Sequence, residues 1–91
     1  MPKKGIDKIA KEKFIFALSK INKVEEIENF LSDLMSSAEL KDLSRRYLAC
    51  EYLNKGKTYE EIRYDLGMGM STINKVRFKT KGSRILNELT G

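Results

Sequence analysis

Helix-capping patterns recur along a chain with a single proline, and they constrain its fold more than any other feature. The proline stands at position 2, and no segment alternates polar and apolar residues as a strand would. Between the caps, apolar residues recur at spacings of three and four, which is the period of an amphipathic helix. The sequence therefore predicts an all-α fold with six helices.

The first half of the chain is predicted to form three helices. The first spans residues 6–21, and Asn22-Lys-Val-Glu25 resembles a capping box that opens a second helix ending near Met35. Ser36-Ser-Ala-Glu39 is a complete capping box, in which the hydroxyl accepts a backbone N–H and the carboxylate reaches back. It starts a third helix, which Gly56 ends in the left-handed conformation.

Three shorter helices are predicted in the second half. Thr58-Tyr-Glu-Glu61 repeats the capping box and starts a fourth helix that stops at Gly67. Ser71 is expected to cap a fifth helix that runs to about Lys79. A sixth covers residues 83–90. The predicted inner residues are Ile62 and Leu66 in the fourth helix and Ile73 and Val76 in the fifth. The apolar face of the sixth helix consists of Ile85, Leu86 and Leu89.

Apolar residues of the second and third helices form two stripes that a lone helical pair cannot hide from water. The stripes consist of Val24, Ile27, Leu31, Leu34, Leu40, Leu43 and Tyr47. A chain of 91 residues buries only about 60 to 65% of the surface that it exposes when unfolded. We therefore expect these residues to form the core of a homodimer. The alternative is a monomer in which the first and last helices cover both stripes.

Positive charge gathers towards both ends of the chain. Of the net charge of +5, residues 1–23 carry +5, residues 24–66 carry −4 and residues 67–91 carry +4. No carboxylate occurs from Gly67 to Asn87. The basic residues there are Lys75, Arg77, Lys79, Lys81 and Arg84. Such a surface is suited to phosphate groups, although a merely solvated basic face has the same composition.

The absence of histidine and the single cysteine exclude most catalytic and metal-binding arrangements. No imidazole base, Cys-His pair, CxxC metal site or internal disulfide is available. Cys50 stands among apolar residues at helical spacing, which favours a reduced core residue over a reactive thiol. No apolar run approaches the roughly 18 residues of a membrane span, and residues 1–5 lack the apolar core of a signal peptide. We expect a cytoplasmic, non-enzymatic protein that uses no metal, cofactor or membrane.

The stretch DLGMGMSTINKV, residues 65–76, interrupts the helical pattern with two glycines. A short capped helix, a tight glycine turn and a second short helix are typical of a helix-turn-helix, whose second helix enters the major groove of double-stranded DNA. Gly67 is expected to leave the fourth helix with a positive φ, and Gly69 to let the backbone turn closely without a Cβ clash.

Helical spacing divides the residues around this turn into two sets. The candidates for base contact are Met70, Ser71, Thr72, Asn74 and Lys75. The candidates for phosphate contact, which set the register without reading sequence, are Tyr59, Arg63, Arg77, Lys79 and Lys81. Asn74 is suited to adenine and Lys75 to guanine. Met70 is equally suited to a thymine methyl group or to the core.

From about Leu31 to Val76 the chain resembles the tryptophan repressor family, in particular its short relatives that lack an assigned ligand. The matching run is FLSDLMSSAELKDLSRRYLACEYLNKGKTYEEIRYDLGMGMSTINKV. The residues that fit the pattern are Leu43, Arg46, Leu53, Gly56, Leu66, Gly67, Gly69, Thr72 and Ile73. The resemblance implies an intertwined all-helical homodimer whose helix-turn-helix motifs meet successive major grooves about 34 Å apart.

The same resemblance argues against tryptophan as the effector. In tryptophan-responsive members two arginines flank the ligand; Arg46 matches the first, and Lys75 stands at the second. Val76 replaces a glycine that makes room for the indole ring, and Lys79 replaces a serine. Overpacking by Val76 would cost on the order of 1 to 3 kcal/mol. Three alternatives stay open: the protein binds another small effector beside Arg46, it has no effector, or Arg46 simply forms an ion pair with Asp42.

The sequence thus favours a homodimeric, sequence-specific DNA-binding transcription regulator, with a repressor as its expected form. Its expected organisation is a single domain over residues 1–91, with dimerisation helices in 6–56, the helix-turn-helix in 58–79 and the C-terminal helix in 83–90. The alternative is a helical dimeric interaction module whose basic surface binds an acidic protein partner.

Overall fold

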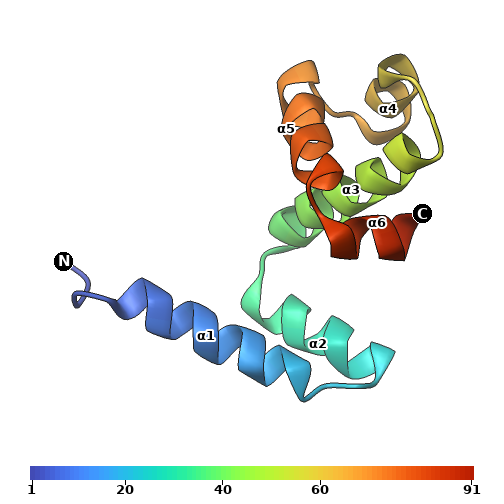
Figure 1. Cartoon of the computed structure of the whole chain (residues 1–91). Helices are drawn as coiled ribbons and strands as arrows, with labels where there is room; N and C mark the ends of the chain where they lie inside the picture. The colour runs from blue at the N-terminus through green and yellow to red at the C-terminus, as the bar shows by residue number, and fades with distance from the viewer. The chain divides into compact units, whose positions relative to one another are not determined.

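The computed structural model describes residues 1–91 and contains six helices and no strand, as the capping patterns predict (Figure 1). The helices are α1 (Ile6–Ser19), α2 (Val24–Leu34), α3 (Ser37–Asn54), α4 (Tyr59–Leu66), α5 (Met70–Lys81) and α6 (Arg84–Thr90). The chain divides into two compact units, residues 1–37 and residues 38–91. The predicted assignment of 6–56 to dimerisation and 58–79 to DNA binding stays a prediction.

The first unit consists of α1 and α2, which meet through the aromatic rings of Phe14 and Phe30. The two rings are stacked, with 5.7 Å between their centroids. The predicted cap at Asn22 is wrong: Lys23 is the N-cap of α2, in an extended conformation and without a side-chain cap hydrogen bond. A capping side chain must belong to the N-cap residue to reach the N–H groups of the first turn, and Asn22 comes one residue too early.

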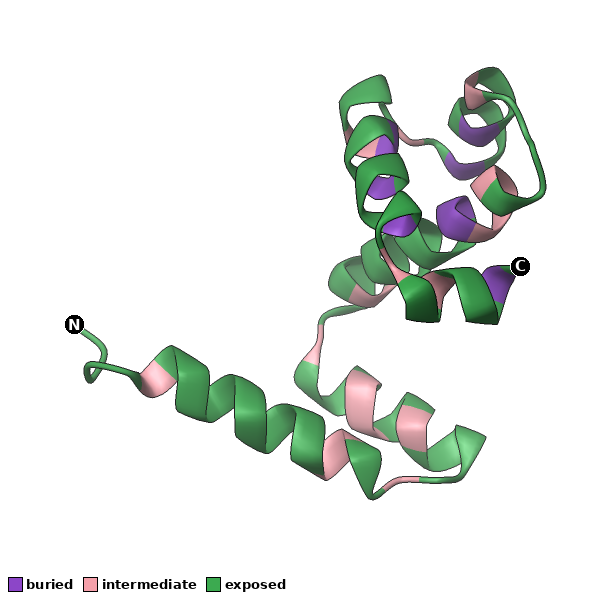
Figure 2. Ribbon diagram, viewed as in Figure 1, coloured by how far each residue is buried: buried purple, intermediate pink, exposed green.

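No residue of α1 or α2 is buried within the chain (Figure 2). Of the predicted dimer residues in this unit, Val24 is 81% exposed and Leu34 is 62% exposed, whereas Ile27 and Leu31 are half-buried. On α1, Ile15 and Phe16 are also exposed. Two helices with so much apolar surface in water leave a large part of the hydrophobic stabilisation unused.

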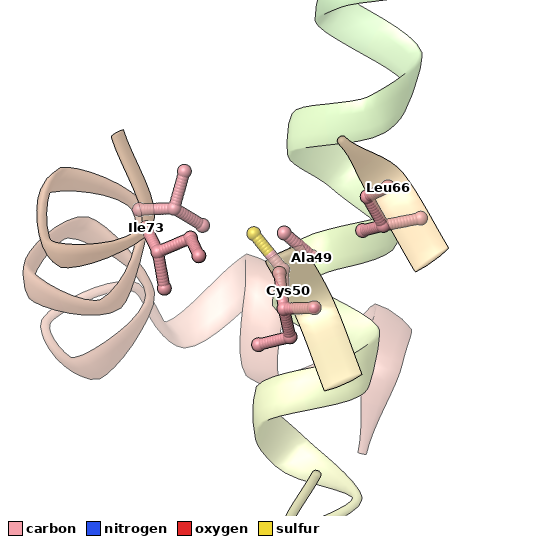
Figure 3. Close-up of a cluster of buried hydrophobic side chains, with 6 residues drawn as sticks. Ala49, Cys50, Leu66 and Ile73 are labelled. Carbon is pink, nitrogen blue, oxygen red and sulfur yellow. The ribbon is translucent and has the colours of Figure 1, made fainter. Parts of the chain in front are cut away.

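The second unit has a small core in which α3, α4 and α5 each bury two apolar side chains. The six residues are Ala49, Cys50, Ile62, Leu66, Ile73 and Val76. Figure 3 shows Ile73 reaching from its own helix towards Ala49 and Cys50, with Leu66 on another side of the cluster. The predicted inner residues of the fourth and fifth helices are therefore confirmed, and Cys50 is a buried free thiol.

The third helix buries only its C-terminal part. Leu40 is half-buried, whereas Leu43 and Tyr47, at 50% and 44% exposure, lie on its open surface. The helix begins at Ser37, directly after the predicted capping residue Ser36. It ends at Asn54, and Gly56, two residues later, has the predicted left-handed conformation with a φ of 76°.

The last helix is attached by side-chain hydrogen bonds and by the packing of Leu86 against the core. The amide of Asn87 donates to the carbonyl oxygen of Thr80 (3.0 Å), and the amide of Asn54 in α3 donates to Asn87 Oδ1 (3.1 Å). The packed side of α6 therefore carries Leu86 and Thr90. Of the predicted apolar face of this helix, Leu86 packs against the core, whereas Ile85 and Leu89 are 66% and 63% exposed.

Candidate nucleic-acid interface

α4, the glycine turn and α5 form a helix-turn-helix in which both ends of α4 follow the predicted pattern. The hydroxyl of Thr58 accepts a hydrogen bond from the N–H of Glu61 at 3.1 Å, which satisfies one of the free donors of the first turn. Gly67 has φ 63° and ψ 34°, and its N–H donates to the carbonyl oxygen of Arg63 at 3.0 Å. A side chain at this φ would be strained, so the turn requires glycine.

The start of α5 differs from the prediction in two respects. Gly69 is the N-cap residue and provides no side-chain hydrogen bond, so Ser71 lies inside the first turn and does not cap the helix. Gly69 also has an ordinary φ of −78°, and a Cβ built on it meets nothing within 4 Å. The predicted Cβ clash at Gly69 is therefore wrong within this chain.

Most of the predicted base-contact residues lie on the open surface of α5. Its inner face consists of Ile73, Val76 and Thr80, all buried. Ser71, Asn74 and Lys75 are exposed, Met70 is 41% exposed and Thr72 is half-buried. The exposed face carries no carboxylate, since Asp65 and Glu88 are the acidic residues nearest in sequence. A helix of this kind can approach the negative charge of a DNA groove without repulsion.

The side chains of the predicted phosphate-contact residues differ in their interactions with the rest of the chain. Arg77 Nη1 donates a hydrogen bond to Tyr59 Oη at 3.1 Å, and the guanidinium carbon lies 5.8 Å from the centroid of the tyrosine ring. This hydrogen bond raises the pKa of Arg77 above its ordinary value. Arg63 pairs weakly with Glu60, at 3.7 Å, in an exposed position. Lys79 and Lys81 are exposed.

Arg46 lines a cavity of about 540 Å³ between α3, α5 and α6. The residues around it are Leu43, Arg46, Tyr47, Cys50, Thr72, Lys75, Val76, Lys79 and Leu86. The three residues in which the sequence departs from the tryptophan-responsive pattern thus gather beside Arg46, as the resemblance implies. Arg46 and Asp42 form no ion pair, although both also border a smaller cavity near Gly67. Three cations with apolar walls would suit an anionic ligand with an apolar body.

Sequence reasoning missed three exposed residues in or next to the helix-turn-helix. Phe78 is 80% exposed on α5, three and four residues after Lys75 and Asn74, so helical spacing alone places it on their face. Tyr64 is 89% exposed on α4. Lys57 precedes the Thr58 cap and lines a cleft with Tyr59. An explicit search for exposed aromatic or basic residues at helical spacing would have found the first two.

Two other functional classes, membrane-spanning proteins and metal-binding proteins, depend on structural features of their own. None of its helices combines the length and the apolar character that crossing a bilayer requires. No group of three or more histidine, cysteine or acidic side chains is placed to hold a metal ion.

The family comparison matches this architecture. The family model described as Trp repressor protein covers residues 10–90, which include five of the six helices in full and most of α1. No curated protein and no solved structure matched the chain. Because the match extends over most of the chain, the protein belongs to the Trp repressor protein family, a family of helix-turn-helix DNA-binding regulators rather than enzymes.

Proposed function

We propose that this protein is a sequence-specific transcription regulator that binds double-stranded DNA as a homodimer, with repression as its expected effect. One observation carries the proposal. The capped α4 and the Gly67 turn hold α5 by Ile73 and Val76, so that Ser71, Asn74 and Lys75 face outward on a surface without carboxylates. Small polar residues near the start of such a helix let the backbone approach base edges.

The roles of individual side chains follow from their chemistry. Asn74 can bond adenine through two hydrogen bonds and Lys75 can bond the acceptors of guanine, each worth about 1 to 3 kcal/mol of discrimination. Ser71, Thr72 and Met70 complete the proposed base-contact set. Arg63, Arg77, Lys79 and Lys81 supply positive charge for the phosphate backbone, and Tyr59 holds Arg77.

Homodimerisation is supported by the apolar surface that each unit leaves in water. In the first unit Val24 and Leu34 are exposed, and in the second Leu43 and Tyr47 are 50% and 44% exposed. Covering such surface is favourable at roughly 25 cal/mol per Å². A second copy carries the same surface, so a two-fold dimer is the economical way to cover it.

No effector is needed for this proposal, and we do not expect tryptophan to act as one. Val76 is 8% exposed at the wall of the cavity beside Arg46, so its branched side chain occupies space that a flat ring would need. The protein is expected to act in the cytoplasm, where its DNA target would be.

The deciding experiment is selection of binding sites from random duplex DNA by the full chain, with and without tryptophan. We expect one enriched motif with two half-sites and an affinity that falls steeply between about 50 and 200 mM salt, because each neutralised phosphate releases counterions. Failure to enrich a motif contradicts sequence-specific binding.

A triple variant separates DNA binding from the alternative, an interaction module for an acidic protein partner. Ser71→Ala, Thr72→Ala and Asn74→Ala together remove base-bonding groups and leave every positive charge in place. They should abolish the selected motif while weak, salt-dependent DNA binding remains. If instead an acidic protein is bound equally well by both forms and DNA by neither, the interaction module is the correct function.

A further inference from the structure

A second cleft lies on α5, away from the cavity beside Arg46. It has a volume of about 470 Å³ and is formed by the end of α3, the start of α4, the C-terminal half of α5, and α6. Three cations line it, Lys57, Arg77 and Lys81, together with the ring of Tyr59 and the amides of Asn54 and Asn87. No carboxylate lines this cleft, so the three positive charges repel one another there.

The walls of this cleft are held in place before any ligand arrives. Asn54 bonds Asn87 and Thr90, and Asn87 bonds the carbonyl oxygen of Thr80, so the amides tie α6 to both α3 and α5. Tyr59 packs against the buried core. A preformed wall binds a ligand without the entropic cost of ordering it.

Arg77 is oriented by Tyr59 and retains bonding capacity. One guanidinium nitrogen donates to Tyr59 Oη, at 3.1 Å. A guanidinium has five N–H donors in a planar fork, so the remaining donors match two oxygens of one phosphate group. Lys57 is only loosely engaged, since its Nζ lies 3.9 Å from Glu61 and both side chains are about half exposed.

Two of the three cations, Arg77 and Lys81, lie on α5, and their positions connect the cleft to the proposed base-contact surface. Arg77 and Lys81 come three and seven residues after Asn74, so the three residues follow one edge of the helix. They extend over about 10 Å of helix axis at 1.5 Å per residue. A DNA strand whose base meets Asn74 would therefore pass its backbone along the mouth of the cleft.

We propose that this cleft holds one phosphodiester group of the DNA backbone in each half-site. Arg77 binds two oxygens of the phosphate, and Lys57 and Lys81 neutralise its charge. Tyr59 is a positioning residue that aims Arg77 and does not itself contact the phosphate. This inference rests on the proposed DNA-binding function. It adds Lys57 to the phosphate-contact residues and assigns the cleft to one particular phosphate of each DNA half-site.

The test replaces the phosphates of the selected duplex, one at a time, by neutral methylphosphonates and measures equilibrium affinity. For the unaltered protein, the sensitive positions should include one per half-site, the phosphate held in the cleft, whose replacement weakens binding on the order of tenfold, as expected for loss of charge-assisted hydrogen bonds. The variant that combines Arg77→Ala and Lys81→Ala should bind both duplexes alike at that position. Its slope of log affinity against log salt should be shallower by about two units, one for the phosphate of each half-site.

Three further variants define the roles of single residues. Lys79→Ala removes another exposed cation of α5, which lines the other cavity, so it should keep the full sensitivity at this phosphate. Tyr59→Phe retains the ring and loses the hydroxyl, and should reduce that sensitivity without changing the selected motif. Lys57→Ala should give a smaller reduction, because Glu61 already offsets part of its charge.

The outcomes distinguish this inference from the function on which it rests. Suppose that the unaltered protein binds its motif, and that the variant with Arg77→Ala and Lys81→Ala is as sensitive to every methylphosphonate as the unaltered protein. The cleft then does not hold a phosphate, whereas the proposed DNA-binding function stands. A changed base motif in that variant would instead assign these cations to base reading and overturn the inference. If the unaltered protein binds no DNA, both proposals fail.

Discussion

The phenolic hydroxyl of Tyr52 in α3 donates a hydrogen bond of 2.8 Å to Oδ2 of Asp65 in α4. The two residues are 13 positions apart, and their bond holds the first helix of the helix-turn-helix against α3. The hydrogen bond to the carboxylate, together with partial burial and the negative charge of Asp65, raises the pKa of Tyr52 above 10.0. The proton on Tyr52 is therefore linked to the position of α4.

Tyr52 should make the free energy of unfolding fall at alkaline pH. Because its pKa is higher in the folded chain, the folded state keeps a proton that the unfolded state loses. This contribution is complete below about pH 10 and is lost as the pH rises through the folded pKa. Urea unfolding on both sides of pH 10 should show a steeper decline for the unaltered protein than for Tyr52→Phe. Equal declines would contradict the linkage.

The two faces of α5 should respond differently to truncation. Ile73 is 0% exposed, so Ile73→Ala should lower the free energy of unfolding by about 2 to 5 kcal/mol through lost burial and a residual cavity. Phe78→Ser, at 80% exposure, should change it by less than about 0.5 kcal/mol. Denaturant titration of both variants provides the comparison. A large loss in Phe78→Ser would mean that Phe78 is covered in the assembled protein.

The two glycines of the turn should differ in their tolerance of side chains. Gly67→Ala places a Cβ at a φ of 63° and should destabilise the chain by roughly 1 to 2 kcal/mol. Gly69→Ser meets no atom within 4 Å and adds a capping hydroxyl, so it should stabilise the chain by a few tenths of a kcal/mol. Thermal unfolding of the two variants measures the difference. A comparable loss in both would show that Gly69 is confined by something outside this chain.

The protein should have twice the mass of one 10.5 kDa chain in solution. Leu34→Glu places a charge on the proposed dimer surface and should shift the mass towards that of the single chain, because burying an unpaired carboxylate is costly. Tyr64→Glu changes an 89% exposed residue of α4 and should leave the mass unchanged. Sedimentation equilibrium gives both masses. A single-chain mass for the unaltered protein at working concentrations would contradict the dimer.

Tryptophan at about 1 mM should not raise the melting temperature of the protein. A ligand present at 100 times its dissociation constant stabilises the folded state by about 2.7 kcal/mol, which a thermal melt detects easily. We expect no shift, because Val76 lines the cavity beside Arg46 and Lys75 offers a point charge where a planar guanidinium would bind two carboxylate oxygens. A clear upward shift would contradict this.

The sequence by itself determined the helices and most of their ends. The Thr58 cap and the stops at Gly56 and Gly67 depend on residues within a few positions of each other, so local chemistry suffices to predict them. The same local reasoning failed at Asn22 and Ser71, because Asn22 comes one residue before the N-cap of α2 and Ser71 comes two residues after the N-cap of α5. Apolar spacing likewise identified Ile62, Leu66, Ile73 and Val76 as core residues.

Only the tertiary structure decided which distant side chains meet. Tyr59 and Arg77 are 18 residues apart, and Asn54 and Asn87 are 33 apart, so no helical period relates them. Their pairing depends on how α4, α5 and α6 pack on α3, which arises from the summed burial of the core rather than from any short motif. For the same reason, the sequence showed a cluster of basic residues, and only the packing of the helices showed that these residues line two separate clefts.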